Sequence, residues 1–193
     1  MKGMNLIMEI RYFDHAATTM VNPAVLEEML PYLKEKYGNP SSLYTLGREA
    51  KRAIEEARKR VADILNCEPN EVYFTAGGSE SDNMALKGLA HSNYNKGKHI
   101  ITSKIEHPAV LHTCKALEKQ GFRITYLNVN KDGIVDLNEL RRSIRNDTIL
   151  ISIMFVNNEI GTIEPIEEIA KIAKMYNIIF HTDAVQACRT YSY

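Results

Sequence analysis

Four polar segments each follow an apolar run of the sequence, and each carries a different group able to bind or react. They are AGGSESDN (76–83), KIEHPAV (104–110), NNEIG (157–161) and HTDAVQ (181–186). In an open parallel sheet, ligands bind outside the carboxyl ends of the strands. If the apolar runs are parallel strands, these four segments meet at one edge of the sheet and form one site.

The first segment has the composition of a phosphate-binding turn. Gly77 and Gly78 lead into a predicted helix whose first turn carries Ser79 and Ser81. Free backbone N–H groups and the helix dipole favour an anion there, and a serine hydroxyl adds a donor. The spacing matches neither a Walker A loop nor GxGxxG. The alternative interpretation is a tight turn in which Ser79 caps the helix.

The second segment places an imidazole at a strand–helix junction. His107 precedes Pro108, the predicted start of a helix, and its ring could stack on a planar ligand or move protons. The alternative is a capping or surface histidine. His112 and Cys114 lie on different faces of the helix, so we predict no metal site there.

The last two segments offer amides and a carboxylate. Asn157 and Asn158 end a buried strand, where one amide reaches a ligand or both serve a turn. Asp183 ends the last predicted strand, with Gln186 three residues later. Such a carboxylate needs a cationic partner or hydrogen bonds, or it caps the next helix. A phosphate cradle, an imidazole, an amide and a carboxylate together suit pyridoxal 5′-phosphate, whose pyridinium nitrogen binds a carboxylate.

The segments around these polar stretches predict alternating strands and helices. The expected strands are 71–75, 98–103, 123–129, 148–156 and 178–182, and the expected helices are 24–38, 48–65, 79–90, 108–118, 136–144 and 165–175. Parallel strands joined through helices make right-handed crossovers, and the helices cover both faces of the sheet. We therefore predict an α/β fold of three layers with a mostly parallel sheet.

Composition excludes several other classes of function. Lys and Arg together number 24, as do Asp and Glu, so charge gives no case for nucleic acid or a membrane surface as a partner. The longest apolar run, 149–156, is far shorter than a membrane span. The three cysteines are widely spaced and the amino terminus lacks a signal-peptide pattern, which favours a cytoplasmic protein.

Six motifs together resemble one known family. They are YFDHAATT (12–19), YGNPSS (37–42), GGSESDN (77–83), EHPAV (106–110), VNNEIG (156–161) and HTDAVQ (181–186). In order and spacing they closely resemble cysteine desulfurases, the NifS/IscS-like enzymes of the class V aminotransferase group. The resemblance implies the fold type I architecture of pyridoxal-phosphate enzymes.

The resemblance also transfers roles onto single residues of this chain. The implied cofactor-binding positions are Gly78, Ser79, His107, Asn158, Asp183 and Gln186. The first two match the phosphate-binding pair, with Ser79 standing where the family usually has Thr. His107 matches the catalytic imidazole that stacks on the pyridine ring and helps proton transfer. Asn158 and Gln186 match contacts near the ring hydroxyl, and Asp183 matches the partner of the ring nitrogen.

The implied reaction is pyridoxal-phosphate-dependent removal of sulfur from L-cysteine, which gives alanine and an enzyme persulfide. The sulfur would serve Fe–S clusters or tRNA thiolation through a sulfur-acceptor or scaffold protein, and the family is homodimeric. Two alternatives are a non-catalytic remnant with at most a binding role and an enzyme similar to selenocysteine lyase.

The match to the family pattern ends at Ala187. We expect an N-terminal active-site segment (1–22), a partial large domain (23–187) and a non-family tail (188–193), without the C-terminal small domain. The 193 residues contain no Ser-x-His-Lys segment, whose lysine forms the Schiff base in the family, and no persulfide cysteine loop. We therefore expect non-covalent cofactor binding at most, no activity in isolation, and marginal stability from an exposed apolar sheet edge.

Overall fold

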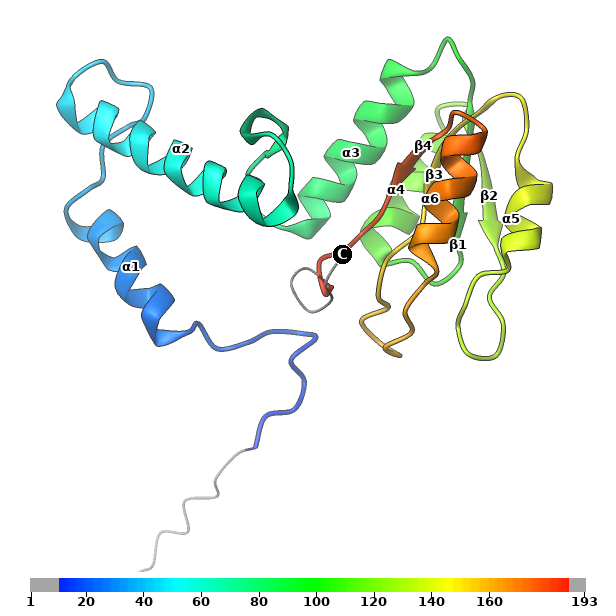
Figure 1. Cartoon of the computed structure of the whole chain (residues 1–193), viewed down its shortest axis with the longest axis horizontal. Helices are drawn as coiled ribbons and strands as arrows, with labels where there is room; N and C mark the ends of the chain where they lie inside the picture. Colours follow the sequence, from blue (N-terminus) through cyan, green and yellow to red (C-terminus); the bar gives the residue numbers. More distant parts are fainter. Residues whose placement is uncertain (1–10, 188–193) are drawn as a thin grey trace, which may run out of the picture. The chain divides into compact units, whose positions relative to one another are not determined.

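The computed structural model describes residues 11–187, and the chain divides into two compact units after Phe74. The C-terminal unit contains a sheet of four strands in the order β2-β1-β3-β4, and every pairing is parallel (Figure 1). The strands are β1 (His99–Ser103), β2 (Arg123–Leu127), β3 (Thr148–Ser152) and β4 (Ile179–His181).

Four helices of the C-terminal unit cover the two faces of this sheet. They are α3 (Gly78–Ser92), α4 (Pro108–Glu118), α5 (Leu137–Ser143) and α6 (Ile166–Met175). Ile100 and Leu150 pack with α3 and α4, whereas Ile101 and Ile151 pack with α5 and α6. Neighbouring residues of a strand point to opposite faces, so β1 and β3 divide two hydrophobic cores. The predicted three-layer α/β fold is confirmed.

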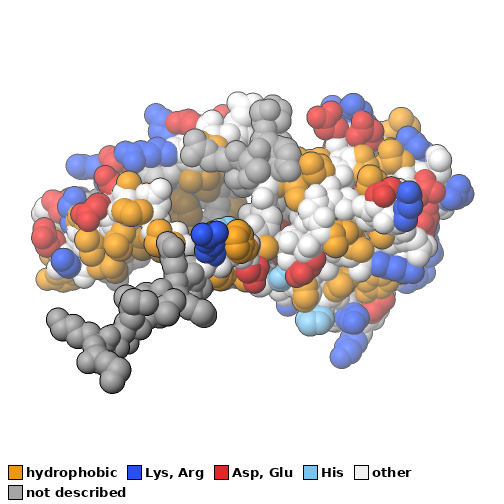
Figure 2. Space-filling model, turned by 90° about the horizontal axis from the view of Figure 1, so that it is seen from below, with side chains coloured by type: hydrophobic (Ala, Val, Ile, Leu, Met, Phe, Trp, Pro, Cys, Tyr) orange, Lys and Arg blue, Asp and Glu red, His pale blue; other side chains and the backbone are white. Residues whose placement is uncertain are grey.

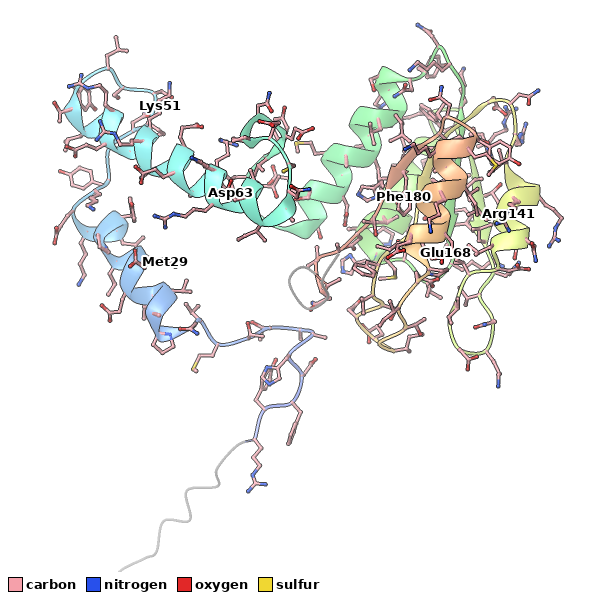
Figure 3. The ribbon with its side chains drawn as sticks, in the orientation of Figure 1. Met29, Lys51, Asp63, Arg141, Glu168 and Phe180 are labelled. Carbon is pink, nitrogen blue, oxygen red and sulfur yellow. The ribbon has the colours of Figure 1, made fainter. Side chains whose placement is uncertain are left out.

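Buried polar contacts hold the strands in register. The ring of His99 on β1 lies between two hydroxyls, with Nδ1 at 2.7 Å from Thr148 Oγ1 and Nε2 at 2.8 Å from Thr125 Oγ1. These contacts tie β1 to both of its neighbours at the amino end of the sheet. On the outer layer, Glu168 of α6 and Arg141 of α5 are exposed, while Phe180 of β4 packs against the core (Figure 3).

The N-terminal unit is helical and contains α1 (Pro23–Lys34), α2 (Thr45–Leu65) and the short 3₁₀ helix η1 (Pro69–Glu71). Asn22 caps α1 by accepting a hydrogen bond from the Ala24 N–H at 2.9 Å. Pro31 lies inside α1, which continues to Lys34. α2 ends at Asn66, whose left-handed conformation (φ 52°) terminates the helix.

One predicted strand is wrong, and the other four are shorter than expected. Val72 to Thr75 have no strand structure, because a strand needs a paired neighbour and none among residues 11–187 pairs with this segment. The strand predicted over 148–156 ends at Ser152, and the one predicted over 123–129 ends at Leu127. None of the helices within residues 11–187 has both the length and the apolar character to cross a bilayer.

Candidate functional site

The carboxyl edge of the sheet brings three of the predicted polar segments together, as expected. β1, β3 and β4 are parallel, and their last residues are Ser103, Ser152 and His181. The segments that carry His107, Asn158 and Asp183 leave the sheet at this edge. The fourth segment lies against them, because α3 begins at Gly78, which adjoins Val185 of the HTDAVQ segment.

The amino end of α3 has the geometry of an anion cradle. The N–H groups of Gly78 and Ser79 have no acceptor among residues 11–187, and the Ser79 side chain is exposed. A Cβ on Gly78 would lie 2.7 Å from Val185 Cγ2, whereas one on Gly77 would meet nothing within 4 Å. Gly78 therefore keeps space open between the helix end and the HTDAVQ segment.

Side-chain hydrogen bonds connect the first turn of α3 to the loop that precedes it. Thr75 Oγ1 and Ser81 Oγ lie 2.7 Å apart, and the Ala76 N–H donates to Glu80 Oε2 at 2.6 Å. The carboxylate of Glu80 is thereby held on the loop that precedes the helix. Asn83, one turn later, donates from Nδ2 to the Ser79 carbonyl at 2.8 Å.

His107 is the N-cap of α4. Its Nδ1 accepts a hydrogen bond from the Ala109 N–H at 3.1 Å, so Nδ1 carries no proton in this arrangement. The remaining nitrogen, Nε2, is therefore the protonated one in the neutral ring. The ring is half-buried and lies close enough to Asp82 of α3 to oppose the rise in the pKa of that carboxyl. The capping role that we gave as the alternative is present, and it leaves the ring itself available.

Asn157 and Asn158, which follow β3, differ in burial and in their hydrogen bonds. Asn157 is buried and donates from Nδ2 to the Ile105 carbonyl at 2.9 Å, which ties this segment to the one that carries His107. Its Oδ1 accepts from the N–H groups of Glu159 and Ile160. Asn158, the predicted ligand, is half-buried and donates only to Glu159 Oε1, at 3.2 Å, among residues 11–187.

Asp183 lies at the centre of a charged cluster. Its Oδ1 accepts from the Val185 N–H at 3.0 Å, and its Oδ2 has no hydrogen-bond partner among residues 11–187. His181, two residues earlier on the same face of the strand, lies 3.7 Å from Asp82 Oδ1 through Nε2. Its Nδ1 lies 2.9 Å from Ser152 Oγ.

Burial shifts the pKa values of this cluster. Desolvation and the nearby charge of Asp183 raise the pKa of Asp82 to about 6, against an opposing contribution from His107. Burial lowers the pKa of His181, although Asp183 acts in the other direction. Burial thus raises the pKa of the Asp82 carboxyl and lowers that of the His181 imidazole, which brings the two values toward each other.

A second buried carboxyl lies below the site. Glu106 Oε1 accepts from Ser103 Oγ at 2.6 Å and from the Met154 N–H at 3.1 Å, while Oε2 has no partner among residues 11–187. Burial raises the pKa of Glu106 to about 8, more than these hydrogen bonds lower it. Glu106 is therefore protonated at neutral pH, and it braces the segment that presents His107.

The structure adds three residues that sequence analysis did not select: Asp82, Glu106 and His181. A signal was present for two of them. Asp82 lies one turn before Leu86 and two turns before Ala90, the buried stripe of α3, so helical spacing placed its carboxylate inside. His181 precedes Asp183 by two residues and must share its face of the strand. Glu106 had no such signal, because its burial depends on the path of a loop.

The cofactor-binding roles of all the predicted site residues remain predictions. Gln186 is exposed in the turn that follows Asp183, which closes with the Ala187 N–H on the Ala184 carbonyl at 2.9 Å. The predicted N-terminal active-site segment belongs to the other unit, and its first ten residues, 1–10, lie outside the described residues. The predicted non-family tail, 188–193, also lies outside them.

The described residues fit pyridoxal 5′-phosphate at both of its ends. At the phosphate end, two free N–H groups and the space beside Gly78 match an anion. At the ring end, Asp183 Oδ2 is unpaired among residues 11–187 and can accept from a protonated ring nitrogen. Among these residues there is no group of three His, Cys, Asp or Glu side chains arranged for a metal ion.

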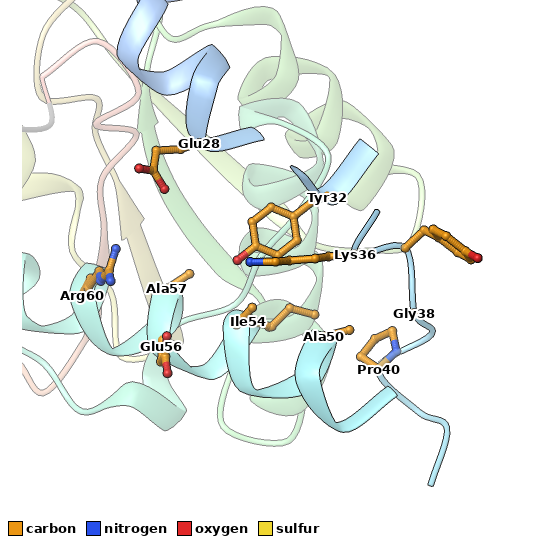
Figure 4. Close-up of a pocket in the computed structure, with 12 residues that line it drawn as sticks. Glu28, Tyr32, Lys36, Gly38, Pro40, Ala50, Ile54, Glu56, Ala57 and Arg60 are labelled. Carbon is orange, nitrogen blue, oxygen red and sulfur yellow. The ribbon is translucent and has the colours of Figure 1, made fainter. Parts of the chain in front are cut away.

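The N-terminal unit contains a separate cavity of about 560 Å³ between α1 and α2 (Figure 4). Its walls contain both acidic residues, Glu28 and Glu56, and basic residues, Lys36 and Arg60, together with apolar residues of α2. The ammonium of Lys36 lies 5.5 Å from the centre of the Tyr32 ring. None of the predicted cofactor-binding residues lines this cavity.

The fold is thus an α/β domain whose carboxyl edge gathers ligand-type side chains. A family model described as Aminotransferase class-V matches residues 11–191. The chain belongs to the class-V aminotransferase family and is a homologue of cysteine desulfurase IscS. The family that the sequence motifs predicted is therefore confirmed.

The similarity to individual proteins covers nearly all of this chain. Cysteine desulfurase IscS of Methanosarcina thermophila is 64% identical over 188 residues, which make up 96% of this chain and 46% of that protein. The IscS of Dictyoglomus turgidum is 59% identical over 175 residues, or 91% of this chain and 44% of that protein. The chain spans about half the length, or slightly less, of these curated relatives.

Solved structures give the same result in three dimensions. A NifS-like protein superimposes with a TM-score of 0.89 at 46% identity, covering 91% of this chain and 49% of that one. A structure described as SspA in complex with cysteine gives a TM-score of 0.89 at 45% identity, covering 92% and 51%. The chain therefore corresponds to part of these folds.

Proposed function

We propose that residues 75–187 form part of the pyridoxal-phosphate-binding domain of a cytoplasmic cysteine desulfurase. The single observation that supports this most is the pairing of two complementary ends: the open cradle at Gly78 and the unpaired Asp183 Oδ2. The two are joined through Val185, which lies beside the cradle and whose N–H holds the Asp183 side chain. One cofactor can thus engage both ends.

Each residue of the site has a distinct task in this proposal. The N–H groups of Gly78 and Ser79, with the Ser79 hydroxyl, bind the phosphate. Asp183 accepts a hydrogen bond from the protonated ring nitrogen, which keeps that nitrogen protonated and the bound pyridoxal phosphate an electron sink. His107 covers the ring with its imidazole and holds a proton on Nε2, because Nδ1 is occupied by the Ala109 N–H. Asn158 and Gln186 orient the ring hydroxyl.

The proposed substrate is L-cysteine, which the proposal takes from the IscS homologues and from the structure described as SspA with cysteine. The products are alanine and a persulfide that passes to a sulfur-acceptor or scaffold protein. The complete reaction needs a Schiff-base lysine and a persulfide cysteine. We propose that the 193-residue chain alone binds the cofactor without a covalent bond, has no desulfurase activity, and gains stability from a partner segment at its sheet edge.

The experiment measures binding of pyridoxal 5′-phosphate to the 193-residue chain by equilibrium dialysis. We expect saturable binding that dialysis reverses and that borohydride does not fix to the protein. Asp183→Asn removes the charge opposite the ring nitrogen and weakens binding about tenfold. Asp63→Asn, an exposed residue of α2, is the matched control and leaves binding unchanged. An affinity for pyridoxal 5′-phosphate that Asp183→Asn leaves unchanged, or alanine release from cysteine by this chain, contradicts the proposal.

A further inference from the structure

Three side chains form a buried polar row beside Asp183 that the proposed site does not use. Ser152 at the end of β3 is 0% exposed, and its Oγ lies 2.9 Å from Nδ1 of His181 at the end of β4. Nε2 of the same ring lies 3.7 Å from Oδ1 of Asp82 on α3. The row therefore runs from the centre of the sheet to the helix that carries the phosphate cradle.

The inference takes Ser152 as the donor in its contact with Nδ1 of His181, an arrangement that the 2.9 Å separation allows. A serine hydroxyl can donate to Nδ1 of a neutral imidazole, and the other ring nitrogen then carries the proton. That proton lies on the nitrogen 3.7 Å from Asp82 Oδ1, a separation longer than a direct hydrogen bond but short enough for a strong electrostatic interaction. The side chains of His181 and Asp82 are only 13% and 5% exposed, so water screens their interaction weakly.

The surroundings of Asp82 disfavour the charged form of its carboxyl group, and a proton shared with His181 offsets this. Burial and the charge of Asp183 both raise the pKa of Asp82, and His107, from the cap of α4, opposes them. Glu106 adds a further acidic group facing Asp183 from the loop after β1. Within residues 11–187, neither Asp82 nor Asp183 has a Lys or Arg ion-pair partner.

We propose that Asp82 is a positioning residue that shares one proton with His181 and supplies a second negative charge to the subsite for the ring nitrogen. This inference rests on the proposed function, because it assigns Asp82 to the subsite built around Asp183. Asp82 does not touch the ring nitrogen itself. It acts through the field that it adds to that of Asp183, and His181 holds it in place from the strand.

The charge of the pair changes with pH in a defined direction. Burial raises the pKa of Asp82 to about 6 and lowers that of His181, so a single proton joins the pair as the pH falls through about 6. Above this range the pair carries one negative charge, which favours a protonated ring nitrogen. Below it the pair is neutral and Asp183 acts alone. Proton uptake belongs to the pair as a unit.

Proton sharing is tested first on the unsubstituted 193-residue chain without cofactor. Long-range ¹H–¹⁵N spectra at pH 7.5 report which nitrogen of His181 carries the proton. We expect Nε2–H, and a titration midpoint that falls by at least about half a pH unit in Asp82→Asn, since removal of a nearby negative charge disfavours the imidazolium. A proton on Nδ1, or a midpoint that Asp82→Asn leaves unchanged, overturns the sharing of a proton.

The second charge is tested by the dissociation constant of pyridoxal 5′-phosphate at two pH values. We expect Asp82→Asn to weaken binding ~fivefold at pH 8 and not at pH 5.5, since a buried charge several ångströms away contributes on this order. Asp63→Asn leaves both values unchanged. An equal loss at both pH values shows a merely structural role and overturns the inference. Failure of the unsubstituted chain to bind at either pH overturns the proposed function and the second charge with it, whereas the His181 titration still decides the proton sharing.

Discussion

The two units of the chain place their apolar residues in opposite ways. No residue of α1 is buried, and Leu33 and Tyr37 are 70% and 74% exposed. In the C-terminal unit, every residue of β1 and β3 is buried between two layers of helices. Figure 2 shows the consequence at the surface, where apolar side chains lie among charged ones over the part of the molecule that contains α1 and α2.

The buried cores that stabilise the fold and the predicted cofactor-binding residues therefore belong to the same unit, the C-terminal one. Burial of apolar surface is the main favourable contribution to folding, and the two hydrophobic cores lie within residues 75–187. The predicted cofactor-binding residues also lie within this range. The N-terminal unit carries apolar residues that its own helices do not cover, so its sequence suits contact with further protein.

The largest expected effect comes from deleting a core side chain in one unit and an exposed one in the other. Ile101→Ala removes a fully buried side chain of β1 and should lower the free energy of unfolding by about 3 kcal/mol. Leu33→Ala on α1 should change it by less than about 0.5 kcal/mol. Urea unfolding followed by circular dichroism gives both values. Equal losses would show that the contrast between the units is wrong.

The next effect is a pH dependence that resides in the C-terminal unit. Burial raises the pKa of Glu106 to about 8, above that of the unfolded chain, so the folded state binds the extra proton between these values. Its contribution to stability is therefore present at low pH and is lost as the pH rises toward 8.

We expect the free energy of unfolding to fall by about 2 kcal/mol between pH 6 and pH 8. Glu106→Gln should remove most of this slope, because the amide does not titrate. Glu27→Gln, at an exposed position of α1, should leave the slope as it is. Urea unfolding at several pH values measures it, and a slope that persists in Glu106→Gln would assign it to other groups.

A smaller effect concerns the space beside the phosphate cradle. A methyl group on Gly78 would lie 2.7 Å from Val185 Cγ2, so Gly78→Ala should weaken pyridoxal 5′-phosphate binding about tenfold by moving the HTDAVQ segment. Gly77→Ala adds the same group where nothing lies within 4 Å, in extended backbone that any residue adopts. Fluorescence titration compares the two variants. Equal affinities would show that the cradle is not where the phosphate binds.

The smallest effect compares one helix cap from each unit. His107→Ala removes the cap of α4, which packs in a core, and should cost about 1 kcal/mol of stability. Asn22→Ala removes the cap of α1, which buries nothing, and should cost only a few tenths of that amount. Thermal unfolding measures both. His107→Asn restores a capping acceptor without the ring, so it should recover stability but not cofactor affinity.

Sequence patterns predicted most of the C-terminal unit because its elements have strong local signals. Proline at the start of α4 and the apolar run of β3 identify these elements without tertiary information. The segment Val72 to Thr75 has an equally strong strand composition, yet strand structure needs a partner that composition cannot supply. The same limit explains why the strand predicted to 156 ends at Ser152.

The sequence located those candidate site residues whose place depends on the end of a strand, and their roles stay predictions. Asp183 and His107 were found because they directly follow strands and their chemistry is distinctive. Asp82 and Glu106 were missed because burial, which changes their chemistry, depends on how α3 and a loop pack on the sheet. Asn157 is the amide that ties two loops together, and residue type alone did not separate it from Asn158, which the family resemblance selected as the ligand.

The most direct test of the central claim is hydrogen–deuterium exchange of the 193-residue chain with and without pyridoxal 5′-phosphate. The claim is that the predicted phosphate-binding and ring-binding residues act together at the carboxyl edge of the sheet in the C-terminal unit. We predict that the cofactor slows exchange in peptides covering 76–83, 104–110 and 181–187, and leaves those covering 23–65 unchanged. Protection of the α1–α2 region instead, or no protection at saturating cofactor, would contradict the account.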